Sequence, residues 1–285
     1  DKIILKSFDQ LQANGIEVRC GMNVTAIDRA RHTATACSTA GDETFNYDRL
    51  VLAPGSDALI PPPFRTAEDL YNVVNSLDDL IALRRKRAEV ISHKGKVRWA
   101  VIGGGLIGCE VASDLAKAGD DVVLYHALPR LMERQLVEED SASLLQVMQD
   151  MSITVKLDAA VSGFETVEGS LAVRLADEVA PGFDAILVAC GFKPRIELAH
   201  LAGLEARRGI VVNEYLRTSD SEIFALGDAV ECADGRIYAY VMPIRQQALW
   251  LARYLTGQTD SPWTPPAFSP RAKVHGFTAA HPYLT

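Results

Sequence analysis

The chain has 285 residues, 48% hydrophobic and 23% charged, enough for about two folded domains. A formal net charge of −8 argues against nucleic acid or an anionic membrane as a general partner. The five cysteines include no C-x-x-C pair, which excludes a zinc site or disulfide framework and predicts a reducing, cytoplasmic location. No apolar run approaches about 18 residues and no signal peptide is evident, so no membrane segment is expected.

The first part of the chain predicts a short helix followed by strands. Pro54 and Gly55 stop the last of these strands, and Pro61-Pro62-Pro63 predicts a stiff linker near a domain boundary. The elements expected here are a helix at 7–14 and strands at 16–19, 25–36 and 44–52.

The middle of the chain alternates strands with helices, which predicts a parallel α/β sheet carrying an inserted antiparallel piece. The basic run Arg84-Arg85-Lys86-Arg87 is interpreted as a solvated helix end, with a docking patch for an acidic protein as the alternative. We expect helices at 67–90, 106–118 and 141–151, and strands at 97–102, 122–125, around 154, 162–166, 171–175 and 185–189.

A glycine-rich turn follows the strand at 97–102 and opens the next helix, which is the context a dinucleotide-binding motif requires. Gly103 suits the tight turn, Gly105 the approach of a pyrophosphate, and Gly108 the close packing of helix on strand. The N–H groups of Leu106 and Ile107 open the helix, whose positive end binds phosphates.

The position that reads the cofactor's ribose lies at the end of the second strand. NAD specificity usually needs an acid there, but the strand ends in His126, which we place among the cofactor-binding residues. Arg130 and Arg134 follow and could meet a 2′-phosphate, although a surface role is the simpler interpretation. We expect the nicotinamide cofactor to be NADH, and NADPH stays an alternative. We do not favour a catalytic role for His126 or His275, and we expect both at the surface.

A second signature ends in Gly227-Asp228, after a short apolar strand at 223–226. An acid at a strand's carboxyl end can accept hydrogen bonds from sugar-alcohol hydroxyls. The alternative for Asp228 is an N-cap of a following helix.

Four strings in one order carry a resemblance to a known family: V-I-G-G-G-L-I-G-C-E, A-C-G-F-K-P-R, G-I-V-V-N-E-Y-L-R-T-S-D-S-E-I-F-A-L-G-D and Y-V-M-P-I. From about residue 16 to 260 the chain resembles the FAD-dependent pyridine nucleotide oxidoreductases, and within them the rubredoxin reductases. The resemblance implies an α/β fold of two Rossmann-like, three-layer domains with parallel sheets, the NAD domain inserted in the FAD domain. The implied ranges are 1–64 and 215–261 for the FAD domain, 65–214 for the NAD(P) domain and 262–285 for the start of an interface domain.

The resemblance also implies roles for individual residues. Asp228 would bind the FAD ribitol, and Gly227 would allow its approach. Glu110 would lie near the nicotinamide carboxamide. Further cofactor-binding positions implied are Pro54 and Gly55, Gly191 with Pro194 at the return between domains, and Met242 and Pro243 at a helix start facing the flavin.

The implied activity is hydride transfer from NADH to FAD and release of single electrons to a small redox protein such as rubredoxin. We expect no catalytic side chain and no metal. We expect the protein to be a monomer or a homodimer. The family's first glycine fingerprint, which binds FAD, would lie before Asp1, and the interface domain stops early. We therefore expect a fragment that binds FAD poorly and purifies colourless.

Other functions stay open. A C-x-x-C as in thioredoxin reductases is absent, but NADH oxidases, peroxidases and coenzyme A disulfide reductases would carry their redox Cys before Asp1. A looser similarity to the nitrite reductase large subunit allows a multidomain reductase. The alternative from another class is a non-catalytic NAD-binding module.

Overall fold

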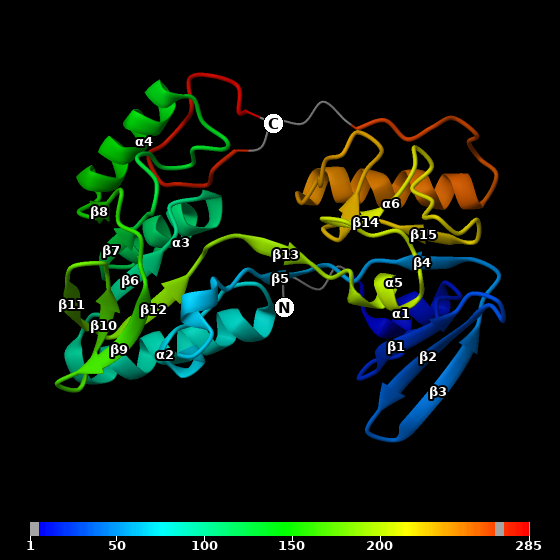
Figure 1. Cartoon of the computed structure of the whole chain (residues 1–285), viewed down its shortest axis with the longest axis horizontal. Helices are drawn as coiled ribbons and strands as arrows, with labels where there is room; N and C mark the ends of the chain where they lie inside the picture. The colour runs from blue at the N-terminus through cyan, green and yellow to red at the C-terminus, as the bar shows by residue number, and fades with distance from the viewer. Residues whose placement is uncertain (1–5, 266–270, 285) are drawn as a thin grey trace. The chain divides into compact units, whose positions relative to one another are not determined.

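The computed structural model describes residues 6–265 and 271–284, and the chain divides into two compact units. Unit 1 comprises 1–55 and 194–264, and unit 2 comprises 56–193 and 265–285 (Figure 1). Unit 2 is thus inserted between two segments of unit 1, the arrangement that the resemblance implied. The boundaries differ from the expected ranges, because 56–64 group with unit 2 and 194–214 with unit 1.

The centre of unit 2 is a parallel four-stranded sheet in the order β12-β6-β7-β8 (Figure 1). Three of its strands, β6, β7 and β12, are mostly apolar and buried on both faces, as in other parallel sheets, whereas the edge strand β8 is more exposed. Along β6, Trp99 and Val101 pack with the helices, whereas Ala100 and Ile102 pack against the other layer. The strands are β6 (Arg98–Ile102), β7 (Asp121–Tyr125), β8 (Thr154–Lys156) and β12 (Ala185–Val188).

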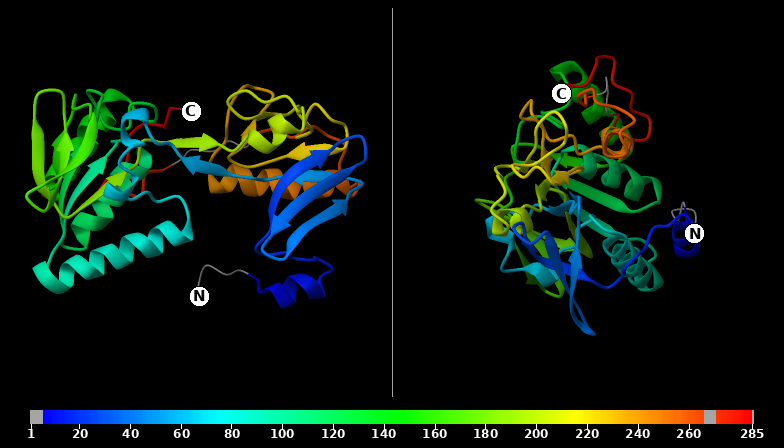
Figure 2. Two further views of the ribbon diagram at one scale, coloured as in Figure 1. Left: turned by 60° about the horizontal axis from the view of Figure 1, so that its bottom comes forward. Right: turned by 90° about the vertical axis from the view of Figure 1, so that its right-hand side faces the viewer.

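Helices cover one face of this sheet and an antiparallel meander covers the other (Figure 2). The helices are α2 (Leu77–Lys94), α3 (Leu106–Lys117) and α4 (Glu138–Asp150). The meander consists of β9 (Gly163–Val167), β10 (Ser170–Arg174) and β11 (Val179–Phe183). The sequence analysis missed β11, because Pro181-Gly182 interrupts its pattern; the strand lies at the edge of its sheet, where proline is tolerated.

Unit 1 is built from short strands and α6 (Val241–Leu255), whose Leu251 joins one cluster of buried side chains. The expected single strand at 25–36 is wrong: the chain turns back at Ala30–His32, and His32 takes a left-handed φ of 53°. Residues 16–19 form no strand, and 44–52 divides between β3 and β4. The elements are α1 (Phe8–Ala13), β1 (Asn23–Asp28), β2 (Thr33–Ser38), β3 (Gly41–Asn46), β4 (Leu50–Leu52), α5 (Glu197–Leu201), β14 (Ile210–Val211), β15 (Ile223–Ala225) and β16 (Val230–Glu231).

The chain passes from one unit to the other through two strands that pair with each other, β5 (Ser56–Ala58) and β13 (Phe192–Pro194). Two 3₁₀ turns follow β5, η1 (Pro62–Phe64) and η2 (Glu68–Leu70), where the sequence predicted a linker and the start of a helix. The helix α2 begins later than expected because Ser76 provides a capping box with Asp79.

The described C-terminal segment, 271–284, packs on unit 2. Val274, Phe277 and Tyr283 join the core beside α3 and α4. The buried Asp140 carboxylate accepts the N–H groups of Ala280 and His281 at 2.8 and 2.9 Å. The start of an interface domain at 262–285 stays a prediction, and Pro266 and Pro270 fall outside the described residues.

One buried carboxylate ties α2 to the sheet. Asp120 accepts hydrogen bonds from Arg87 Nε at 2.6 Å and from Trp99 Nε1 at 3.1 Å, and only 1% of its side chain is exposed. The basic run at 84–87 lies in the middle of α2, so the expected helix end is wrong. Arg84 and Arg85 are exposed to solvent, but Arg87 has a structural role. None of the helices within 6–265 and 271–284 has the length and apolar character needed to cross a bilayer.

We expect Asp120→Ala to lower the free energy of unfolding of unit 2 by about 3 kcal/mol, since it leaves Arg87 and the Trp99 indole without their acceptor. Urea denaturation followed by far-UV circular dichroism measures the loss. Asp121→Ala is the matched control: that neighbouring carboxylate is 51% exposed and pairs with Lys96, so its removal should cost less than about 1 kcal/mol. Equal losses of unfolding free energy in the two variants would show that the burial of Asp120 does not add to the stability of unit 2.

Candidate functional site

The glycine-rich turn lies between the end of β6 and the start of α3, as the sequence predicted. Gly105 is the N-cap of α3, with extended backbone, and no side chain caps the helix. The first N–H groups of a helix have no partner within it. The N-terminus of α3, beginning at Leu106 and Ile107, therefore offers donors and a positive dipole end for an anion.

The three glycines of the motif have different surroundings. A Cβ on Gly108 would lie 1.8 Å from the Gly103 carbonyl oxygen, and one on Gly103 would lie 2.3 Å from the Ala189 oxygen. Gly103 also has a left-handed φ of 113°. A Cβ on Gly105 would meet no heavy atom within 4 Å. Gly103 and Gly108 are thus required by packing, while the space at Gly105 is open for a ligand.

At the end of β7, His126 turns back onto this loop. Its Nδ1 accepts the Gly104 N–H at 3.0 Å, so Nε2 carries the proton and faces Glu133 Oε2 at 3.1 Å. The expectation of a surface histidine is wrong, because only 9% of His126 is exposed. Arg130 donates to the backbone carbonyls of Leu136 and Glu133, which fixes the loop.

An apolar pocket opens beside the N-terminus of α3 at the carboxyl end of β12. Gly191, with a left-handed φ of 113°, bends the chain at its rim, and its oxygen accepts the Leu59 N–H at 2.9 Å. The pocket is lined by Ala58, Val74, Asn75, Ile107, Leu187, Val188, Ala189, Gly191 and Phe192. Sequence reasoning missed Val74 and Asn75, which come from the segment before α2.

Glu110, one turn into α3, already has a partner. Its Oε1 accepts the backbone N–H of Lys273 at 2.7 Å. His275 joins this segment to α3 by three further contacts: its N–H donates to Ser113 Oγ at 2.9 Å, its Nε2 lies 2.8 Å from Asp114, and its Nδ1 lies 3.2 Å from Lys117 Nζ. The described C-terminal segment thus engages the acid that the resemblance placed near the nicotinamide, whereas His275 lies near the surface as expected.

In unit 1, the two remaining predicted turns follow neighbouring parallel strands. Ala225 pairs with Leu52, so Pro54-Gly55 after β4 and Gly227-Asp228 after β15 come from the same edge of the paired strands. The Gly227 N–H donates to Gln247 Oε1 of α6 at 2.9 Å. Asp228 is half-buried and precedes the strand β16, so the N-cap alternative is wrong.

The helix α6 begins at Val241 without a side-chain cap. Met242 is 47% exposed, while Pro243 is buried. The uncapped N-terminus of this 15-residue helix offers a positive dipole end, as α3 does in unit 2.

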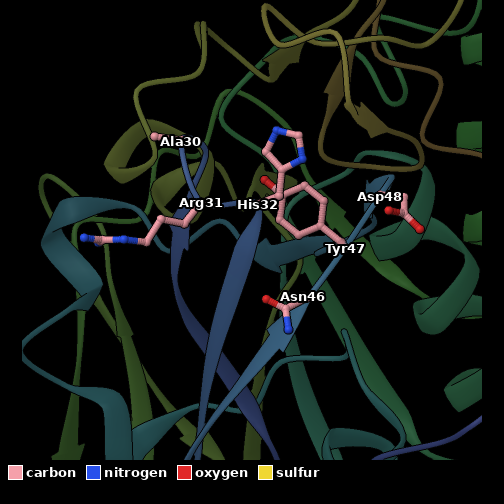
Figure 3. A pocket seen from close by; sticks show the side chains of 6 residues that line it. All are labelled: Ala30, Arg31, His32, Asn46, Tyr47 and Asp48. Carbon is pink, nitrogen blue, oxygen red and sulfur yellow. The ribbon is translucent and has the colours of Figure 1, made fainter.

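A hollow of about 380 Å³ lies at the turn between β1 and β2 (Figure 3). His32 and Tyr47 stack there with ring centroids 5.5 Å apart. The hollow is wide open and contains none of the predicted site residues; it is lined by Ala30, Arg31, His32, Asn46, Tyr47 and Asp48. No group of metal-ligating side chains occurs in the part of the chain that the structure describes.

The family model described as pyridine nucleotide-disulphide oxidoreductase matches residues 2–248. The rubredoxin-NAD(+) reductase of Alcanivorax borkumensis is 34% identical over 245 residues, which cover 86% of this chain and 61% of that protein. The nitric oxide reductase FlRd-NAD(+) reductase of Klebsiella pneumoniae is 34% identical over 225 residues, covering 79% and 57%. The chain thus spans about three fifths of the length of these relatives.

Solved structures resemble the chain over nearly its whole length. The covalent putidaredoxin reductase–putidaredoxin complex aligns with a TM-score of 0.84 and 30% identity, over 95% of this chain and 65% of that one. The reduced CoADR-RHD of Bacillus anthracis aligns with a TM-score of 0.86 and 25% identity, over 96% and 50%. The α/β class with parallel sheets is therefore confirmed.

We expect Gly108→Ala to lower the free energy of unfolding by about 3 kcal/mol, at the upper end of the cost of overpacking, because its Cβ would collide with a backbone oxygen. Urea titration measures the change. The control is Gly105→Ala, whose Cβ has room and whose stability should match the wild type. A stable Gly108→Ala protein would contradict the close packing of α3 on β6.

Thiol labelling tests the buried cysteines. Burial raises the pKa of Cys109 and Cys232 to about 12 and of Cys190 to about 11. A raised pKa keeps a thiol protonated and unreactive at pH 8. Iodoacetamide followed by mass spectrometry should therefore modify the exposed Cys20 and the half-buried Cys37 first. Rapid labelling of Cys109 in the folded protein would contradict this placement.

Proposed function

Because the chain belongs to the pyridine nucleotide-disulphide oxidoreductase family, we propose that it forms the nicotinamide-binding unit and part of the flavin site of an NAD(P)H-dependent flavin reductase. The observation that carries the proposal is the turn Gly103–Gly108, which combines an uncapped helix N-terminus with open space at Gly105. Bound at these sites, a nicotinamide and a flavin would supply the hydride-transfer and single-electron chemistry.

The residues of unit 2 fit a dinucleotide. The N–H groups of Leu106 and Ile107 would bind the pyrophosphate, and Gly105 leaves space for its approach. The apolar pocket bordered by Ile107 and Gly191 suits a planar ring with few polar contacts. Glu110 would reach a carboxamide only by exchanging its hydrogen bond with Lys273.

The residues of unit 1 fit one side of a flavin. Asp228 would accept hydrogen bonds from the ribitol, with Gly227 and the turn Pro54-Gly55 beside it at the same strand edge. The uncapped N-terminus of α6, at Met242-Pro243, would stabilise negative charge on a reduced flavin. The protein groups named here bind and orient the cofactors, and none transfers a proton.

The acceptor that we propose is a small redox protein of the rubredoxin or ferredoxin type. It is supported by the rubredoxin-NAD(+) reductase relative and by the solved putidaredoxin reductase–putidaredoxin complex. A nucleophilic thiol mechanism has less support among the described residues, since Cys109, Cys190 and Cys232 have raised pKa values. The cytoplasmic location and the oligomeric state stay predictions.

Gly105→Val tests the nicotinamide site. We expect NADH affinity, measured by isothermal titration calorimetry, to fall at least about tenfold, because the side chain would fill the space for the pyrophosphate. The melting temperature should fall only slightly, since no atom lies within 4 Å of the added Cβ and the cost is that of replacing glycine at the N-cap of α3. With FAD supplied, the rate of NADH-dependent rubredoxin reduction measures the reductase activity.

The matched control is Gly163→Val, at a strand position of the same unit where a Cβ would lie 3.8 Å from its nearest neighbour. It should bind NADH as the wild type does. Unchanged NADH affinity in Gly105→Val would remove the proposed site.

A further inference from the structure

We infer that Glu133, held in place by His126, accepts hydrogen bonds from the adenosine ribose of the cofactor and selects NADH over NADPH. The inference rests on the proposed function, because it specifies which cofactor the nicotinamide site takes. It assigns a specificity role to a residue of the loop after β7 that no glycine motif identifies.

The first step is the fixed position of His126. A Cβ on Gly104 would lie 2.8 Å from His126 Cγ and 2.6 Å from Leu131 Cδ2, so the imidazole packs directly on the turn. The His126 N–H donates to the Lys156 oxygen, and its own oxygen accepts the Ala159 N–H, both at 2.8 Å. With Nδ1 bonded to Gly104, the ring can present only Nε2.

The second step is the position of Glu133. Its Oε2 receives the Nε2 proton of His126 at 3.1 Å, so a neutral histidine stands where an acid is usual and holds a carboxylate beyond it. The loop that carries Glu133 is anchored to the turn, because Met132 N–H donates to the Gly104 oxygen at 2.8 Å. The side chain is 23% exposed, and an ionised carboxylate has about four acceptor positions, so some stay available to ribose hydroxyls.

The third step concerns the cations that a 2′-phosphate would need. Both terminal nitrogens of Arg130 donate to backbone carbonyls of its own loop, at 2.6 and 2.9 Å, which holds the guanidinium on the loop. Arg134 is 86% exposed and lies 3.7 Å from Glu133, which balances its charge. The exposed Lys156 ends the neighbouring strand β8. A 2′-phosphate beside the ribose would thus approach the Glu133 carboxylate, which repels it.

The experiment measures Kd for NADH and for NADPH by calorimetry on the full chain. The wild type should bind NADH at least about tenfold more tightly than NADPH. Glu133→Gln retains an acceptor for His126 but removes the charge, so NADH affinity should fall about tenfold and the NADH preference should disappear. Glu133→Arg should reverse the preference. The control Glu139→Gln, on the exposed first turn of α4, should leave both constants unchanged.

The outcomes separate the inference from the proposed function. Equal or tighter binding of NADPH by the wild type, or an unchanged ratio in Glu133→Gln, overturns the role of Glu133 and leaves the nicotinamide site in place. Binding of neither dinucleotide by the wild type overturns the site itself. If Glu133→Gln melts at a lower temperature, Lys156→Gln is the second variant: a persisting preference for NADH supports the role of Glu133, and loss of the preference in Lys156→Gln overturns it.

Discussion

The close approach of α3 to the ends of β6 and β12 is the constraint on which the candidate site depends. Gly108 lies where a Cβ would come within 1.8 Å of the Gly103 oxygen, and Gly103 in turn abuts Ala189. This contact places the helix N-terminus at the carboxyl edge of the sheet, where ligands bind in open α/β folds. The apolar pocket, the open space at Gly105 and the packing of His126 on Gly104 all follow from it.

Local signals predicted the centre of unit 2 well. The ranges expected for β6, α3 and β7 agree with the structure to within one residue, because an apolar run, a glycine turn and Gly119 after the helix all indicate the same boundaries. The prediction of a single strand at 25–36 was wrong because local signals were missing. The turn between β1 and β2 contains neither Gly nor Pro, and its left-handed residue is His32. Tertiary context, not propensity, decides such a turn.

In the candidate site, too, features that depend on neighbouring residues were predicted and long-range contacts were not. The glycine spacing predicted the turn between β6 and α3, because such a turn depends on residues that are neighbours in the sequence. The hydrogen-bond partners of His126 and Glu110 could not be predicted from the sequence. His126 meets Glu133 through a loop that folds back, and Glu110 meets Lys273 from 163 residues away. The bonds of Arg130 to the carbonyls of Leu136 and Glu133 were likewise not predicted.

The hydrogen bond between Trp99 and Asp120 has an optical consequence. The chain has three tryptophans: Trp99 lies in unit 2, while Trp250 and Trp263 lie in unit 1. The Trp99 indole is fully enclosed and fixed against a carboxylate, whereas Trp250 stacks on Tyr254 at 5.1 Å. Replacing the tryptophans of one unit by phenylalanine would leave indole fluorescence in the other unit alone, so that two such variants report the melting of the two units separately.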